Sequence, residues 1–350
     1  DLVIPPIPLF LFTKYTTRDT LYVYMKKILI TLLILCAPLI SLAHVGYVVS
    51  LEEIDSHSGT DTSFLLNALS DPYNIILTLI VLAFFVLLYW IAHHNYFIEH
   101  YCHKIVTKLE SYQEFIPWIL RLSLGIALIG AGSAHSLISP LLPEMTGFAL
   151  MQVVLGFMML SGFMLTPVVL FTVILFLYAL SQDVYLIGNI EFLFGSIALL
   201  VLGNDRPGLD DIFMIPNHAI ESLKKYVPLF IRIGLGGAMI YLALFEKLFN
   251  PHISELVVTK FNLTSAIAVS PEMWVLSTGL IELLVGLFVF IGYHTRLTSA
   301  IAFVVVTTTF FYFKEDVYSH VTLFGMLSVL FITGGGAMSV DNREHTQTLR

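Results

Sequence analysis

The sequence predicts an all-α polytopic membrane protein, with two tandem four-helix transmembrane bundles and one preceding transmembrane helix. Hydrophobic residues make up 57% of the 350 residues and charged residues only 12%, whereas a soluble domain has about 25% charged residues. Apolar segments recur along the chain as an internal repeat, which determines the architecture before any single residue is considered. The net charge of −8, without a basic run, excludes nucleic acid as a partner.

The first residues are expected to be a leader followed by a secretory signal. Residues 1–24 are interpreted as a non-native or mis-assigned leader. Residues 25–43 place Lys26 and Lys27 before an apolar stretch that ends in Ser-Leu-Ala, which is typical of a signal peptide cleaved after Ala43. An uncleaved transmembrane helix is the alternative. Cleavage would leave residues 44–73 as a short acidic segment outside the cytoplasm.

The remaining apolar segments are long enough to cross, or nearly cross, a bilayer. We expect them near residues 74–92, 117–139, 147–164, 167–181, 186–203, 228–249, 273–292, 297–313 and 319–336. A His-rich connector up to residue 116 and the tail 342–350 then lie inside the cell. Most Lys and Arg residues fall on that side, which agrees with the positive-inside rule and predicts a protein of the cytoplasmic membrane.

Three sequence blocks define the repeat. The block Pro117–Gly125 returns as Pro228–Gly236, with Arg121 and Arg232 at the same place. Further matches pair Gly156 and Gly162 with Gly286 and Gly292, and Asp183-Val-Tyr185 with Asp316-Val-Tyr318. They predict a first repeat at 117–211, a linker at 212–227 and a second repeat at 228–341. Each repeat has an even number of helices, so both are expected to share one orientation in the membrane.

The second repeat resembles the DoxX/DoxD family of small four-helix membrane proteins. The likeness rests on an ordered set of short motifs: Arg232–Gly236, Phe245–Leu248, Gly279–Leu287, Gly292–Leu297 and Gly334–Asp341. The first repeat is similar to the same pattern, with His135 in place of Glu246 and Gln152 in place of Glu282. Some family members resemble the quinone-linked subunit of a thiosulfate-oxidising enzyme. The resemblance therefore implies quinone as a cofactor and electron transfer to it.

Glu282, Glu246 and His320 are the candidate proton and quinone site. Glu282 lies in the middle of an apolar segment, where a carboxylate is costly unless it is protonated, paired or facing a cavity. We expect it to be neutral and to face the bundle interior. Glu246 ends a helix beside Lys247, which is expected to extend outward to the interface. A pocket between the three residues could pass protons to a reduced quinone, bind a cation or only lock helices together.

Two other polar positions are candidates for holding a cofactor. Glu191 lies near the start of an apolar segment beside Asn189, and the alternative is a polar residue at the outer interface. Arg232, like Arg121, begins a helix at the inner face, where an anchoring role under the positive-inside rule is the favoured interpretation.

Histidines supply the candidate metal ligands. His93, His100 and His103 share one helical face if the segment is continuous, and this spacing suits zinc, copper or haem iron. His44 would become the amino-terminal residue after cleavage and could chelate copper through its amine and imidazole. The alternatives are a polar helix end and a chance histidine.

The leading functional interpretation is a quinone-associated or redox-accessory subunit, with an oxidoreductase activity on quinone left open. A partner subunit, soluble or in the membrane, is expected beside the lipid bilayer. A small-solute or ion transporter between the repeats is the first alternative, and a non-catalytic membrane scaffold is the second.

Overall fold

The computed structural model describes residues 44–76, 79–80, 83, 105–203, 208–216, 219–265 and 269–342. The described residues are helical, and the β-pairing among them is an isolated bridge between Ser136 and Glu144. The predicted all-α fold is therefore confirmed. Most of the predicted span 74–92 lies outside the described residues.

Four helices form the first half of the membrane domain, and four form the second half, where the first helix continues into a π-helix. The first half has α7 (Ile116–Ser133), α8 (Thr146–Ser161), α9 (Leu165–Gln182) and α10 (Ile190–Leu202), with the 3-10 helix η3 (Val184–Asn189) directly before α10. The second half has α12 (Val227–Leu242), the π-helix η5 (Ala243–Phe249), α14 (Pro271–Ile291), α15 (Thr295–Phe313) and α16 (Val317–Thr333). Shorter 3-10 helices η2 (Gln113–Phe115) and η4 (Glu221–Tyr226) precede α7 and α12.

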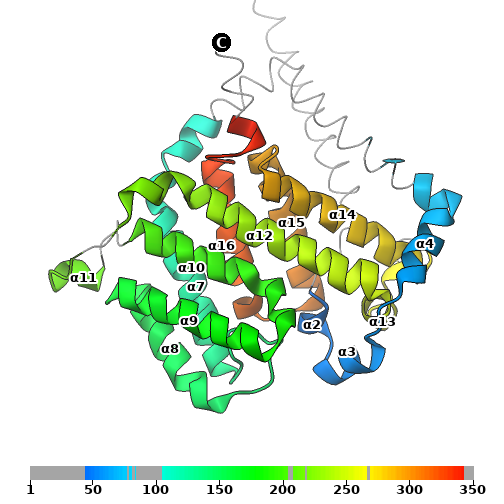
Figure 1. Cartoon of the computed structure of the whole chain (residues 1–350), viewed down its shortest axis with the longest axis horizontal. Helices are drawn as coiled ribbons and strands as arrows, with labels where there is room; N and C mark the ends of the chain where they lie inside the picture. The colour runs from blue at the N-terminus through cyan, green and yellow to red at the C-terminus, as the bar shows by residue number, and fades with distance from the viewer. Residues whose placement is uncertain are drawn as a thin grey trace, which may run out of the picture.

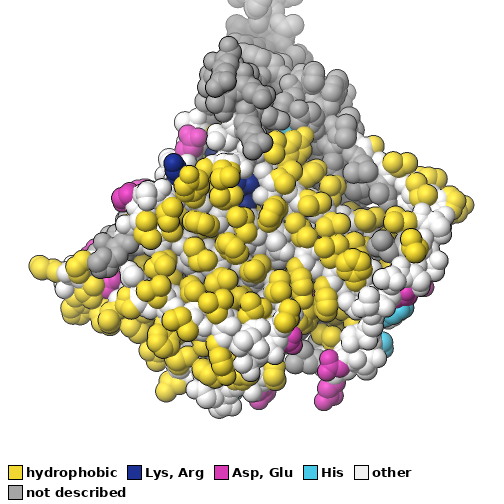
Figure 2. Space-filling view, viewed as in Figure 1, with side chains coloured by type: hydrophobic (Ala, Val, Ile, Leu, Met, Phe, Trp, Pro, Cys, Tyr) yellow, Lys and Arg dark blue, Asp and Glu magenta, His cyan; other side chains and the backbone are white. Residues whose placement is uncertain are grey.

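Six helical stretches among the described residues are long and apolar enough to cross a bilayer. They are Ile105–Ser133, Leu165–Gln182, Val184–Leu202, Glu221–Phe249, Pro271–Ile291 and Thr295–Phe313, and the shorter apolar helices α8 and α16 accompany them. Hydrophobic side chains cover most of the face over α9, α10, α12 and α14, with acidic side chains at its margins (Figure 2). The protein is thus a multi-pass membrane protein in a lipid environment.

The two halves interlock instead of forming separate bundles. The first helix of each half packs on the last helix of the other half, so α7 contacts α16 and α12 contacts α10 (Figure 1). One hydrophobic core includes Leu124 and Phe192 of the first half together with Leu235 and Met326 of the second. Each half therefore completes the other.

The repeated glycines allow close helix contact. A Cβ atom on Gly156 would lie 2.6 Å from the carbonyl oxygen of Gly125, and one on Gly236 would lie 2.8 Å from that of Gly286. Small residues at such crossings let backbones approach. Gly162 and Gly292 end α8 and α14 with φ of 64° and 71°, conformations that glycine adopts without a steric penalty.

Two details differ from the predicted segments. The helix predicted over 117–139 ends at Ser133, because His135 and Ile138 adopt positive φ and begin a loop. The second half contains an additional short helix, α13 (Pro251–Lys260), which the apolar pattern did not predict.

The segment after residue 44 folds onto α13. It comprises α2 (Val45–Val48), α3 (Leu51–His57) and α4 (Thr62–Ser70), whose apolar residues pack with Ile253 and Trp274. The Lys260 ammonium lies 2.9 Å from a carboxylate oxygen of Glu53, which ties α13 to α3. We call residues 44–70 the outer segment, after its predicted location.

Candidate functional site

The π-helix η5 turns two adjacent charged residues inward. Glu246 is fully buried and Lys247 is 1% exposed. The Lys247 ammonium lies 2.7 Å from Glu282 Oε2 of α14 and 3.8 Å from Glu246 Oε2. The expectation that Lys247 extends outward is therefore wrong, because the wider turn of a π-helix brings neighbouring side chains closer in direction than an α-helix does.

Glu282 faces the protein interior, as predicted, and is 3% exposed. The structure gives it a cationic partner that the sequence did not predict. A buried carboxylate is tolerated when a cation and hydrogen bonds compensate its charge. Neutralisation by a proton is consequently not the only way to hold Glu282 in an apolar layer.

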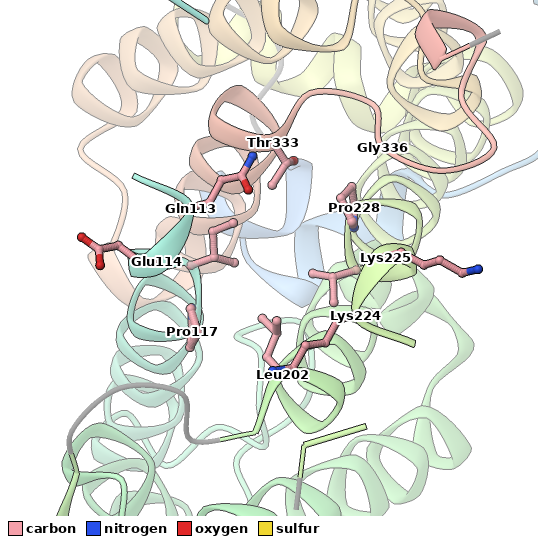
Figure 3. A pocket seen from close by; sticks show the side chains of 11 residues that line it. Gln113, Glu114, Pro117, Leu202, Lys224, Lys225, Pro228, Thr333 and Gly336 are labelled. Carbon is pink, nitrogen blue, oxygen red and sulfur yellow. The ribbon is translucent and has the colours of Figure 1, made fainter. Parts of the chain in front are cut away.

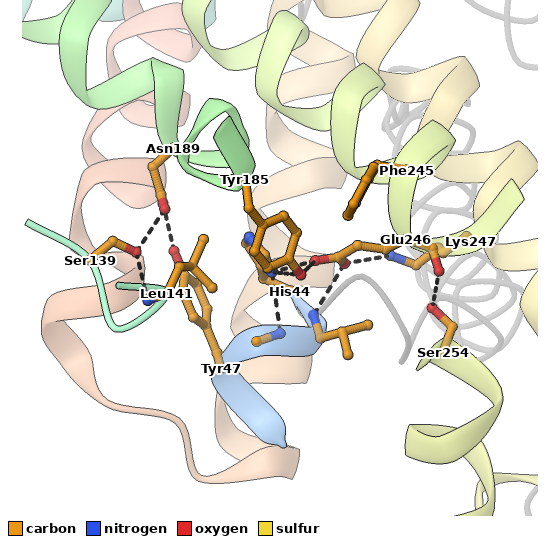
Figure 4. Close-up of polar contacts among 12 residues, drawn as sticks. His44, Tyr47, Ser139, Leu141, Tyr185, Asn189, Phe245, Glu246, Lys247 and Ser254 are labelled. Carbon is orange, nitrogen blue, oxygen red and sulfur yellow. Dashed lines mark hydrogen bonds and ion pairs between the residues drawn. The ribbon is translucent and has the colours of Figure 1, made fainter. Parts of the chain in front are cut away.

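The outer segment closes over Glu246 (Figure 4). His44 Nδ1 lies 2.5 Å from Glu246 Oε1, and the backbone N–H of Val45 donates to Glu246 Oε2 at 3.1 Å. The Tyr185 hydroxyl donates to Glu246 Oε1. The Glu246 carboxylate therefore has partners from two parts of the chain, the outer segment and Tyr185, that are far from it and from each other in sequence.

A second group of buried polar side chains lies beside the one around Glu246 and centres on Asn189 (Figure 4). Asn189 Nδ2 donates to the Tyr47 hydroxyl at 2.6 Å, and Ser139 Oγ donates to Asn189 Oδ1 at 2.8 Å. Glu191, which is 2% exposed, has one oxygen 3.5 Å from Asn189 Nδ2. Tyr47 was not among the sequence candidates, although it lies one helical turn after His44 and on the same face.

A small cavity of about 30 Å³ lies between these two groups of polar side chains. Its polar lining is His44, Tyr47, Asn189, Glu282 and His320, and its apolar lining includes Leu235, Met239, Val306 and Leu327. Glu282, His320 and His44 are thus brought to one cavity, and Glu246 connects to it through Lys247. In its present form the cavity has room for about one water molecule.

Glu315 and His320 form another buried pair at the same end of the molecule. His320 Nε2 lies 3.3 Å from Glu315 Oε2, and Ser319 Oγ lies 2.9 Å from His320 Nδ1. Burial and the nearby Glu246 carboxylate raise the pKa of Glu315 to about 8. Burial also raises the pKa of the Tyr47 hydroxyl, with Glu191 as the next cause, so Tyr47 stays protonated.

The first half contains a neutral version of the Glu282 contact. Gln152 Oε1 accepts from the Ile138 N–H at 2.7 Å, and Gln152 Nε2 donates to the Ser136 carbonyl at 2.8 Å. Gln152 therefore ties α8 to the loop after α7, where Glu282 ties α14 to η5. Of these two corresponding positions, only the one in the second half carries a charged side chain.

Arg232 lies far from this cluster, at the opposite end of α12. Its guanidinium donates to the carbonyls of Phe290 and Ala337 at 3.0 and 2.9 Å. Arg121 makes the corresponding contacts with Met159 and Leu160 at 3.2 and 2.8 Å. Both arginines tie together helix ends, and the structure does not bring Arg232 to the candidate site.

The histidine metal candidates have different outcomes. His93, His100 and His103 lie outside the described residues. His44 uses Nδ1 on Glu246, and no group of three potential metal ligands occurs within the described part of the chain. The copper interpretation of His44 stays a prediction.

A larger cavity of about 620 Å³ lies between the halves at the opposite end from the buried cluster (Figure 3). The starts of α7 and α12 and the ends of α10 and α16 enclose it. Its lining includes Gln113, Pro117, Lys224, Pro228 and Thr333. The volume falls within the range of small-molecule sites.

A comparison with known proteins shows what family the second half is similar to. Residues 227–315, which include α12 to α15, match the family model described as DoxX. Neither the curated proteins nor the solved structures compared with the chain gave a match. The match ends before α16, and a DoxX-like origin of the first half stays a prediction. Residues 227–315 are therefore similar to the DoxX family, and the candidate spans make the chain an integral membrane protein.

Proposed function

We propose that the protein is a quinone-associated, redox-accessory subunit of the cytoplasmic membrane, with the outer segment outside the cell and the C-terminus in the cytoplasm. The observation that carries the proposal is the cavity with Glu282 and His320 at its polar end and α12, α15 and α16 as its apolar wall. A quinone has the same division between a polar head and an apolar body. The DoxX match supports the proposal by resemblance.

The residues present fit such a ligand in kind. Glu282 and His320 can each hold a proton at the cavity, and His320 also contacts Glu315. At about 30 Å³ the cavity is too small for a quinone ring, so apolar side chains such as Leu235 and Leu327 have to move before a ring can enter. A bound quinone supplies two-electron chemistry that also takes up two protons, and the partner subunit supplies the electrons.

Protons can reach the cavity through the buried cluster. Lys247 lies between Glu282 and Glu246, and Glu246 contacts both His44 and Tyr185. This chain of contacts runs from the middle of α14 to the outer segment. It provides acid and base groups within reach of one another, which proton transfer requires.

Photolabelling tests the proposal directly. The full chain in lipid nanodiscs is irradiated with an azido-quinone, and labelled peptides are mapped by mass spectrometry. We expect label on α12, α15 or α16, with strong loss in Glu282→Gln and no loss in the matched control Glu272→Gln, an exposed position on the same helix. Label confined to the lipid-facing side of α9, or equal labelling of both variants, would contradict the proposal.

The 620 Å³ cavity favours one alternative, a small-solute or ion conduit between the halves. That cavity and the smaller one lie between the halves at opposite ends of the molecule. Solute uptake into proteoliposomes, blocked by cross-linking α7 to α12 at the cavity mouth, would support transport. Absence of both labelling and uptake would leave the scaffold interpretation.

A further inference from the structure

Glu191 is a buried acid that the proposed quinone chemistry does not use. It lies in the first turn of α10 and is 2% exposed, and its Oε2 atom has no hydrogen-bond partner. Among the described residues no Lys, Arg or His forms an ion pair with it. An isolated carboxylate in an apolar layer needs a compensating charge or a proton.

Glu191 lines a second cavity, of about 10 Å³, that is separate from the larger spaces. The other polar lining residues all have a side-chain oxygen, and none is basic: Tyr47, Ser139, Asn189, Tyr318, Ser319 and Thr322. The volume is close to that of one water-sized probe. A partially dehydrated ion surrounded by oxygen atoms would fit a space of this size and composition.

The position of this cavity is typical of ion sites in membrane proteins. The span Val184–Leu202 is discontinuous, because the 3-10 helix η3 precedes α10. Ser319 and Thr322 belong to α16 of the other half, so the cavity lies at the contact between the halves. Coupling ions commonly bind at such contacts, beside interrupted helices.

Charge and size select the class of ion. One carboxylate balances one positive charge, whereas divalent cations require more carboxylates or several retained waters, for which there is no room. We propose that Glu191 and the surrounding oxygen atoms bind a sodium ion at the contact between α10 and α16. A proton on Glu191 competes with the ion. This inference does not depend on the proposed quinone function.

Glu191 is the group whose protonation should control ion binding, because the other groups that face it stay neutral. The other titratable groups that line the cavity are the phenols of Tyr47 and Tyr318. From α12, Gly234 packs against the Glu191 backbone and brings no charge: a Cβ atom there would lie 3.1 Å from the Glu191 Cα. Tyr47 and Asn189 border this cavity and the Glu282 cavity, so the ion would sit beside the candidate quinone site.

Equilibrium binding of radioactive sodium to the full chain in nanodiscs tests the inference, with choline chloride holding the ionic strength constant. At pH 8 we expect about one ion per chain, reduced at least tenfold in affinity at pH 5. Glu191→Gln should abolish binding, and Thr322→Val should weaken it about tenfold, the effect of losing roughly 1.4 kcal/mol of interaction. Thermal unfolding in choline chloride identifies variants that fail to fold.

The matched control is Glu272→Gln, an exposed acid on α14, which should bind sodium like the wild type. Sodium binding and quinone labelling are separate readouts, so the two proposals can fail independently. Excess potassium should displace the label far less than excess sodium. No sodium binding by folded wild type, equal binding by folded Glu191→Gln, or equal displacement by potassium would each overturn the assignment.

Discussion

Replacing Lys247 by methionine should strongly destabilise the protein. The Lys247 ammonium is the cation shared by Glu282, at 2.7 Å, and Glu246, at 3.8 Å, and none of the three side chains is more than 4% exposed. Methionine keeps most of the length of the side chain but removes the charge. Removal of one partner from a buried ion pair costs about 3–5 kcal/mol, because the remaining charge is uncompensated.

A double variant separates charge from packing. Lys247→Met combined with Glu282→Gln removes both members of the pair, and replacement of a whole buried pair is often close to neutral. Gln152 shows that an amide can make the corresponding helix-to-loop contact in the first half. We expect the double variant to recover at least about half of the 3–5 kcal/mol lost by the single variant.

Unfolding by SDS in mixed micelles, followed by tryptophan fluorescence, measures these free energies; Trp274 is buried on the same helix as Glu282. Lys260→Met is the matched control, because Lys260 makes an exposed ion pair with Glu53. It should change the unfolding free energy far less. A Lys247→Met variant as stable as this control, or a double variant showing no recovery, would refute the reasoning.

Three further results are expected. Burial raises the pKa of Glu315 from 4.5 to about 8, so as the pH rises the unfolded state loses this proton at a lower pH than the folded state does. Thermal stability should therefore fall from about pH 4.5 and level off above about pH 8. Glu315→Gln should remove that fall. The hydrogen bond to Glu255, and then Asp61, raise the pKa of His252. The stability that this gives is present below pH 6.5 and is lost as the pH rises through the raised pKa. Because Asp61 caps α4, hydrogen exchange in α4 should become faster over that pH range in the wild type but not in His252→Gln. Asp341→Ala should cost about 1–2 kcal/mol in the same SDS titration, because Asp341 accepts from the backbone N–H groups that begin α15 at 2.7 and 3.0 Å.

The apolar pattern predicted the spans well because a membrane helix needs a long apolar run whatever its neighbours are. The interior position of Glu282 followed from the same physics, since an acid facing lipid would lack partners. The inward direction of Lys247 could not be predicted, because the apolar pattern does not distinguish the π-helix η5 from a continuing α-helix. The contact of His44 with Glu246 joins distant parts of the sequence, and no local signal marks it.

The packing of each half on the other has a consequence for shorter proteins that contain only one such half. The faces of α12 and α16 that meet α10 and α7 are covered here by the other half of the same chain. A homologous chain with only one such half would expose those faces to lipid, including glycine-lined surfaces that gain little from acyl chains. Two copies related by a two-fold axis would restore both contacts. The predicted repeat would then make the present chain the covalent equivalent of such a pair, able to carry different side chains, such as Gln152 and Glu282, at corresponding positions of its two halves.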